Sequence, residues 1–452
     1  MGLTSAQMGA VQRLVETAPD VLLMRLNAAL SAARVTDPVF IPVSDLARIE
    51  AADRRARDIV MEPLKGLADP TLEPPQQPML QKSDIARLWR LMKALEPEMT
   101  AAAAKAALAL RAGAEPPPEF NMLCLAVAAA IGQPEPAPEA GAGTGAAAEA
   151  ALWPLAERLR LARLLQLTPV LRSALAKLPN WARSPSGENM AAVRLSFKDA
   201  IAVAEDAGPV YMEALLCHLQ EPHQILRLIS AVMDRPSDRY LAASELADIG
   251  ERLLADVGRR VLAVSRFDPY RGAEGGAEQA ASVMVASAAI RTFEEALALS
   301  REAPWGAKVA AYKQALAQSA ETRLREAEPA VAAALPLQAQ RALGSIAPRP
   351  GPRVDGYPDD GLVRKAEGLL SFLEETRNSA ANAGFGSLRA KVIESLEIRL
   401  DHYVEDLVER LRDDERQDVE WTRAYLEVAA DFSGMVRGPQ AAQIVRRRAA
   451  AA

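Results

Sequence analysis

Apolar residues recur every three to four positions along most of the chain, the spacing that places them on one face of an α-helix. The clearest run has steps of three or four and consists of Leu246, Ile249, Leu253, Val257, Val261 and Val264. Between 152 and 178, leucines occur on nearly every side, which predicts a helix buried inside a bundle. Because no sustained alternation of β-branched and polar residues is found, we expect no sheet. The pattern predicts an all-α protein made of multi-helix bundles.

The first segment, 4–33, is predicted to form one or two amphipathic helices, with Pro19 at the start of the second. Its apolar positions recur at spacings of three, four and seven: Val11, Leu14, Val15, Leu22, Leu23, Leu26 and Leu30. We expect these side chains to form the apolar faces that the two helices bury.

Segments rich in proline, glycine and alanine divide the helical pattern, because proline cannot continue a helix. We expect an N-terminal helical region at 1–115, a linker at 116–150 and a central bundle at 151–346. A second linker at 347–360 is expected to precede a C-terminal module at 361–452, where a helical hairpin is followed by a terminal helix.

The first linker contains a short apolar island at 120–131, which predicts a short helix. Its charge-free part is about half as long as the roughly 20 residues that a membrane-spanning helix needs, so we expect no integral membrane segment. The island is expected to dock either in a groove of a partner protein or on the chain's own bundle. Its candidate contact residues are Met122, Leu123 and Leu125.

The C-terminal module contains a regular apolar seam with steps of three, four, three and four: Ile393, Leu396, Leu400, Tyr403 and Leu407. Such a repeat is typical of helices that pair as a coiled coil. The seam predicts pairing with another helix, either of this chain or of a second copy.

A further candidate contact lies in the loop 266–271, where Arg266, Phe267, Tyr270 and Arg271 precede a glycine-rich segment at 272–276 that we expect to be flexible. Aromatic and arginine side chains are enriched among the residues that dominate binding at protein interfaces. The alternative is a helix cap in which Phe267 and Tyr270 pack inward.

The composition is 50% hydrophobic, 25% charged and 4% aromatic, which is typical of a folded soluble chain with an aliphatic core. Alanine is abundant and arginine outnumbers lysine, which favours a GC-rich bacterial source. The two cysteines, Cys124 and Cys217, form no disulfide framework, and the first residues contain no readable secretory signal. We therefore expect a cytoplasmic protein.

The net charge of −6 disfavours general binding to nucleic acid or to anionic lipid. Two arginine clusters are too small to change this. Arg54, Arg55 and Arg57 are balanced by Asp53 and Asp58. Arg446, Arg447 and Arg448 predict a short basic tail that can touch an acidic surface.

The clustered carboxylates of 413–418 resemble the Asp-rich segments of all-helical prenyl-transferring and terpene-cyclising enzymes. The resemblance covers six residues and implies that Asp413, Asp414 and Asp418 bind Mg²⁺ and through it a diphosphate. No second acidic motif accompanies them, and aromatic residues, which stabilise carbocations in such enzymes, are few. The alternative is a solvated junction between two helices.

A second candidate for a metal site combines Cys217, His218 and His223 with Glu213 and Glu221. A proline between the two histidines interrupts the helix that would have to orient them. We expect a buried cysteine and two histidines at helix ends, and no metal or other cofactor.

These features favour a non-catalytic, cytoplasmic helical adaptor, scaffold or assembly factor that binds one or more proteins, including a further copy of itself. One alternative is an all-helical Mg²⁺-dependent enzyme that acts on a diphosphate through 413–418. A second alternative is a regulatory module that binds a small apolar ligand in the central bundle.

Overall fold

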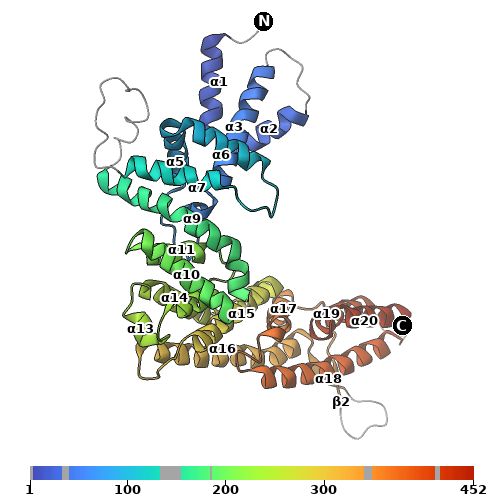
Figure 1. Ribbon diagram of the computed structural model, residues 1–452. Coiled ribbons are helices and arrows are strands. Elements are labelled where there is room, and N and C mark those ends of the chain that lie inside the picture. The colour runs from blue at the N-terminus through green and yellow to red at the C-terminus, as the bar shows by residue number, and fades with distance from the viewer. Residues whose placement is uncertain (1–3, 33–39, 133–153, 184–185, 341–348, 413–417) are drawn as a thin grey trace, which may run out of the picture. The chain divides into compact units, whose positions relative to one another are not determined.

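The computed structural model describes residues 4–32, 40–132, 154–183, 186–340, 349–412 and 418–452 (Figure 1). It is 80% helical, with 19 α-helices and one two-stranded sheet in those ranges, so the all-α prediction is confirmed. The chain forms two compact units, Met1–Met233 (unit 1) and Asp234–Ala452 (unit 2). Their boundary lies inside the range 151–346, and the domain limits expected from the sequence stay predictions.

Unit 1 contains only helices in its described residues. They are α1 Ser5–Thr17, α2 Asp20–Ala32, α3 Phe40–Val60, α4 Glu62–Lys65, the 3₁₀-helix η1 Gly66–Ala68, α5 Lys82–Leu95, α6 Pro97–Ala109, α7 Pro118–Ile131, α9 Leu155–Arg183, α10 Gly187–Val203, α11 Ala207–Cys217, the 3₁₀-helix η2 Pro222–Gln224 and α12 Ile225–Val232.

The long helix α9 is the centre of this unit, because α4, α7, α10, α11 and α12 all pack against it. Its leucines are buried on several sides, as the all-round apolar pattern predicts. The contact between α3 and α6, by comparison, involves small side chains. Helix α3 packs against α6, and the buried positions of these two helices include Ala47, Ala56, Ala103 and Ala107.

Unit 2 contains α13 Asp238–Ala242, α14 Ala247–Ser265, the 3₁₀-helix η3 Pro269–Arg271, α15 Gly272–Ala296, α16 Pro304–Ala334, β1 Leu337–Gln340, β2 Arg349–Pro352, α17 Asp360–Glu375, the 3₁₀-helix η4 Thr376–Asn378, α18 Gly386–Leu411, α19 Val419–Arg437 and α20 Pro439–Ala451. Helices α14, α15, α16 and α17 pack together, and α18 and α19 add to them.

The small sheet corrects the expectation that the chain forms none. Strands β1 and β2 pair antiparallel, with Leu337 opposite Pro352 and Gln340 opposite Arg349. Each strand has four residues, and β2 lies within the range 347–360 that we expected to be linker. Strands this short, one of them with two prolines, contain too few positions to show a period of two.

The end of the chain also differs from the expectation. Helix α20 follows α19 after Gly438, whose positive φ of 95° reverses the chain, and it packs against α19. The Arg446 guanidinium pairs with Glu427 and Asp431 of α19, each at 2.6 Å. The predicted basic tail is therefore the charged side of a packed helix.

The glycine-rich segment 272–276 is the first turn of α15 and is packed, which corrects the expectation that it is flexible. A Cβ atom on Gly276 would lie 2.2 Å from the carbonyl oxygen of Gly368 in α17, and one on Gly368 would lie 2.3 Å from that of Pro269. Because these neighbours are backbone atoms, α17 can approach α15 and η3 this closely only with glycine at both positions.

We expect Gly276→Ala to lower the free energy of unfolding of unit 2 by about 3 kcal/mol, since an added Cβ forces the two backbones apart. This outweighs the gain of about 1 kcal/mol in helix propensity from alanine. Gly356→Ala in the same unit is the matched control, because a Cβ there meets nothing within 4 Å. Urea unfolding of the full chain measures the free energy of unfolding of each variant. Hydrogen exchange of the α15 amides then measures the local stability of this helix. Equal protection of α15 in the two variants contradicts the packing argument.

Candidate functional site

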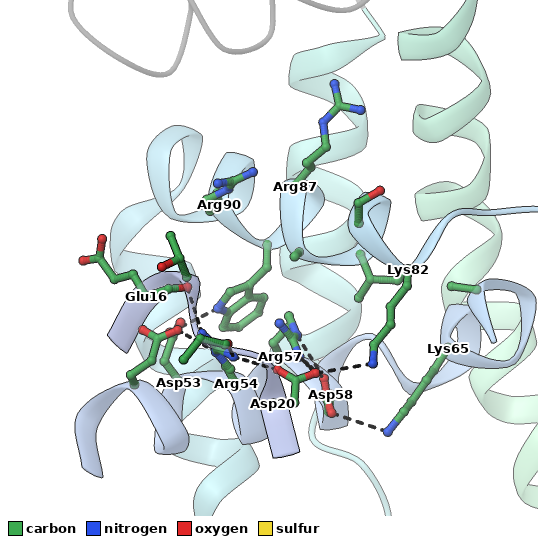
Figure 2. Close-up of a pocket in the computed structure, with 18 of the residues that line it drawn as sticks. Glu16, Asp20, Asp53, Arg54, Arg57, Asp58, Lys65, Lys82, Arg87 and Arg90 are labelled. Atoms are coloured by element: carbon green, nitrogen blue, oxygen red, sulfur yellow. Dashed lines mark hydrogen bonds and ion pairs between the residues drawn. The ribbon is translucent and has the colours of Figure 1, made fainter. Parts of the chain in front are cut away.

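Unit 1 carries a charged cleft with a volume of about 930 Å³ (Figure 2). The end of α1, the start of α2, helices α3 and α5, and the segment 65–70 line it. Its charged lining residues are Glu16, Asp20, Glu50, Asp53, Arg54, Arg57, Asp58, Lys65, Asp69, Lys82, Arg87, Arg90 and Lys93. The volume lies within the range of about 300–1,000 Å³ that is usual for small-molecule sites.

Arg54 joins α1 and α2 to α3 within this cleft. Its side chain is only 13% exposed, and its guanidinium makes five hydrogen bonds. Its acceptors are the carbonyl oxygens of Val15 (3.1 Å), Glu16 (2.8 Å) and Ala18 (2.6 Å) and the carboxylates of Asp20 (2.8 Å) and Glu50 (2.7 Å). These bonds match the five N–H donors of a guanidinium and satisfy carbonyls at the end of α1 that have no partner within their own helix.

Asp20, the first residue of α2, is held by several cations. Besides the hydrogen bond from Arg54, Nη2 of Arg57 lies 3.8 Å from its carboxylate and Nζ of Lys82 lies 3.7 Å from it. Burial by itself would raise the pKa of Asp20, but the hydrogen bond from Arg54 and the charges of Arg57, Arg54 and Lys82 together lower it. The same contacts with Glu50 and Asp20 outweigh the effect of burial at Arg54 and raise its pKa.

Two further carboxylates of α3 complete the network. Asp58 pairs with Arg57 at 2.8 Å and with Lys65 at 3.4 Å. Asp53 accepts a hydrogen bond from the indole N–H of Trp89 at 3.1 Å and pairs with Lys93 at 2.8 Å. Trp89 and Lys93 belong to α5, so Asp53 links α3 to that helix.

Part of this network follows from the sequence and part does not. The balance expected for 53–58 is present where Arg57 meets Asp58, but Arg54 pairs instead with Glu50 one turn earlier and with Asp20 of another helix. The i,i+4 spacing of Glu50 and Arg54 is a readable signal for a helical ion pair. The 34 residues between Asp20 and Arg54 leave no such signal.

The apolar island forms α7 and lies on its own unit. Phe120, Leu123, Cys124, Val127, Ala128 and Ile131 are buried, and α7 packs against α5, α6 and α9. Of the candidate contacts, Leu123 is part of this core, whereas Met122 and Leu125 are 56% and 46% exposed. Only these two remain on the surface of unit 1.

The loop candidates divide in the same way. Phe267 is buried and stacks on Phe372 at 5.9 Å between ring centroids. Tyr270 is 51% exposed, with the Lys365 ammonium 5.5 Å from its ring centroid, and Arg271 pairs with Glu278 at 2.8 Å. Arg266 is exposed at the end of α14. Tyr270, Arg266 and Arg271 thus lie on one short surface segment.

The seam of the C-terminal module belongs to α18. Leu396, Leu400, Tyr403 and Leu407 are buried, and Ile393 is partly buried. Helix α18 packs against α16 and α19 of the same unit. The helices that this seam pairs with are therefore already present in unit 2, and its pairing with a second chain stays a prediction.

The candidate magnesium residues Asp413 and Asp414 lie outside the described residues. Asp418 is described, and its carboxylate pairs with the Arg410 guanidinium. Among the residues that the structure describes, no group of three His, Cys, Asp or Glu side chains is arranged to hold a metal ion.

The histidine candidates make local contacts. Nδ1 of His218 lies 2.8 Å from the carbonyl oxygen of Ala214, and the buried carboxylate of Glu213 accepts a hydrogen bond from the backbone N–H of Gln77 at 3.0 Å. The Nε2 atom of His223 lies 3.7 Å from Glu221. Both cysteines are free thiols, and burial raises the pKa of Cys124 to about 11.

A second, smaller pocket of about 330 Å³ lies where α9 meets the start of α11. Its lining is mainly aliphatic, with a few charged side chains: Ala156, Leu159, Arg160, Arg163, Leu164, Leu167, Ala204, Asp206, Ala207 and Val210. Arg163 and Asp206 pair with each other at 2.7 Å and are both well exposed. This is an apolar pocket with a polar rim in the region where we expected a ligand of the central bundle.

Helices α1 and α2 bury much less than their pattern predicts. Only Val15 and Leu23 are buried among their residues, and they form a small cluster with Ala47 of α3. Large apolar side chains remain exposed on the two helices: Leu14 69%, Val21 61%, Leu22 56%, Met24 69% and Leu26 37%. On α3, Phe40, Ile41 and Ile49 are 43–58% exposed. We call this set of eight side chains the apolar surface of α1–α3.

Comparisons with protein-family models, with curated proteins and with solved structures give no match. In the ranges that the structure describes, no helix combines the length and the apolar character that crossing a membrane requires. The inference of function therefore depends on the charged cleft, the apolar pocket and the apolar surface of α1–α3.

We expect Arg54→Met to weaken the docking of α1 and α2 by about 3 kcal/mol, because it leaves Asp20, Glu50 and the end of α1 without their common donor. Arg48→Met on the same helix is the control, since the pair of Arg48 with Asp45 is exposed on both sides and should contribute less than about 1 kcal/mol. Hydrogen exchange of α1 and α2 amides is the measurement. Similar exchange in the two variants would show that Arg54 is not the anchor.

Proposed function

We propose that this protein is a non-catalytic helical adaptor or scaffold whose protein partner binds the apolar surface of α1–α3. The observation that carries the proposal is the contrast within α1 and α2, where two side chains are buried and five large apolar ones are exposed. Large apolar side chains exposed on helices that pack together, as α1 and α2 do on α3, are candidates for contact with another macromolecule.

The exposed side of α2 has the form of a helix that binds in a groove. Val21, Met24 and Ala28 are exposed and follow one another by three and four positions, so they lie on one face. The buried Leu23 belongs to a different face, which holds α2 to α3. A partner can therefore cover the first face without displacing α2 from its own unit.

Asp20 and Arg54, the central charged groups of the cleft, are not suited to proton transfer. The lowered pKa of Asp20 and the raised pKa of Arg54 keep both groups charged near neutral pH. A general acid or base instead needs a pKa close to the working pH. The two free thiols support the cytoplasmic setting that this proposal includes.

The double variant Val21→Glu with Met24→Glu tests the adaptor function. Two charges on the exposed face should abolish capture of the partner, while the fold persists because both positions face solvent. Met284→Glu with Ile444→Glu is the control, since these side chains are 53% and 57% exposed in unit 2. The measurement is quantitative mass spectrometry of proteins crosslinked to the full chain in its native cell. Partners captured equally by both variants would refute this surface.

A second candidate function is regulation by a small apolar ligand, which the aliphatic pocket of α9 and α11 favours. We expect Val210→Trp to fill that pocket and to prevent retention of a ligand, which native mass spectrometry of the purified chain detects. The control variant Leu195→Trp should retain the ligand, because Leu195 is 63% exposed and lies outside the pocket. A wild-type chain that carries no ligand and binds no apolar fluorescent probe argues against this function.

A further inference from the structure

The charged cleft of unit 1 has properties of an anion-binding site that the adaptor function does not use. Seven lysine and arginine side chains line it, against six aspartate and glutamate side chains. The arginines of α3 are committed to internal contacts: Arg54 makes five hydrogen bonds, and Arg57 pairs with Asp58 and Asp20. The cations with more exposed side chains lie on the segment before η1 and on α5. Two of those on α5 are also paired, Arg87 with Asp84 at 3.7 Å and Lys93 with Asp53 at 2.8 Å.

Lys65 and Lys82 are the first two of these accessible cations. Their ammonium groups lie 3.4 Å from Asp58 and 3.7 Å from Asp20, and their side chains are 62% and 72% exposed. Exposed pairs of this kind contribute little to stability, so an incoming anion can share these cations at small cost. Figure 2 shows both side chains directed toward the Asp20 and Asp58 carboxylates from the same side.

The start of α5 adds to the positive potential. Lys82 and Ser83, the first residues of this 14-residue helix, line the cleft. The N-terminal end of a helix carries a partial positive charge and favours anions. Farther along α5, Arg87 and Arg90 also line the cleft. Figure 2 shows the Arg87 side chain directed away from Lys82 and Asp20, and Arg90 apart from them.

Asp20 shows that the cleft stabilises negative charge. Its carboxylate lies among Arg54, Arg57 and Lys82, which come from two different helices. Despite its partial burial, it is held in the charged form. A second anion beside it would meet Lys65 and Lys82.

From this geometry we propose that the cleft binds a small soluble molecule that carries one or more phosphate groups. Several cations from separate elements suit a multiply charged oxyanion, because lysine acts as a point charge and arginine can form two parallel hydrogen bonds. The volume of about 930 Å³ also accommodates a molecule larger than a single phosphate.

The ligand should also tie α1 and α2 to the rest of the unit. Thr17, Ala18 and Asp20 line one side of the cleft, and residues of α3 and α5 line the other. A ligand that binds only when both sides are in place stabilises their association in proportion to its occupancy. This inference is independent of the partner that we propose for the apolar surface.

Isothermal titration calorimetry of the full chain with pyrophosphate and with ATP tests the site. We expect both probes to bind the wild type and to bind the double variant Lys82→Glu with Arg90→Glu at least tenfold more weakly. Lys105→Glu with Lys177→Glu makes the same change in charge at exposed positions outside the cleft and should bind within twofold of the wild type. Tighter binding of ATP than of pyrophosphate assigns a nucleotide, and equal binding assigns the phosphate groups alone.

A second readout locates the ligand. Pyrophosphate should slow tryptic cleavage after Arg25 of α2 severalfold in the wild type and in the control, but not in the cleft variant. If the glutamate variant does not fold by circular dichroism, Lys82→Ala with Arg90→Ala replaces it. Equal binding by cleft variant and wild type, or no binding of either probe at millimolar concentration, overturns the proposal.

Discussion

Helices whose buried positions are small must approach closely to exclude water, and this constraint governs much of the fold. The chain is only 4% aromatic, so few side chains can fill a wide space between two helices. Alanines occupy buried positions on α3 and α6, and glycines allow the backbones of α15 and α17 to come together. Dispersion contacts between closely spaced backbones replace part of the stabilisation that packing of large side chains would provide.

The N-terminal helices depart from this rule, and the functional surfaces arise from the departure. Helices α1 and α2 bury Val15 and Leu23 but few other side chains, and polar contacts centred on Arg54 supplement that small cluster. An anchor of this type leaves apolar side chains of α2 uncovered and places charged groups along a cleft. The apolar surface and the charged cleft thus have a common structural origin.

The sequence predicts helices well here, because their apolar period of three to four is long and regular. It also identifies α9 as a central helix from leucines on every side.

The sequence does not predict burial or pairing where these depend on residues far away in the chain. Leu14 on α1 and Leu22 and Leu26 on α2 recur at the spacings of buried positions, yet the described residues do not cover them. The cleft is hidden for the same reason, since Asp20 and Arg54 meet only after three helices have packed. The seam at 396–407 is a converse case, where the pattern indicates pairing but does not say that the helices it pairs with belong to the same chain.

The burial of Cys124 separates the chemistry of the chain's two thiols. Its neighbours Thr168 and Arg172 lie on α9, and with a pKa near 11 it holds almost no thiolate at neutral pH. Electrophiles and oxidants react with thiolates, so modification of the folded chain should fall on Cys217, which is only partly buried at the end of α11. Cys217 is therefore a single native site in unit 1 for attaching a fluorescent label or a crosslinker.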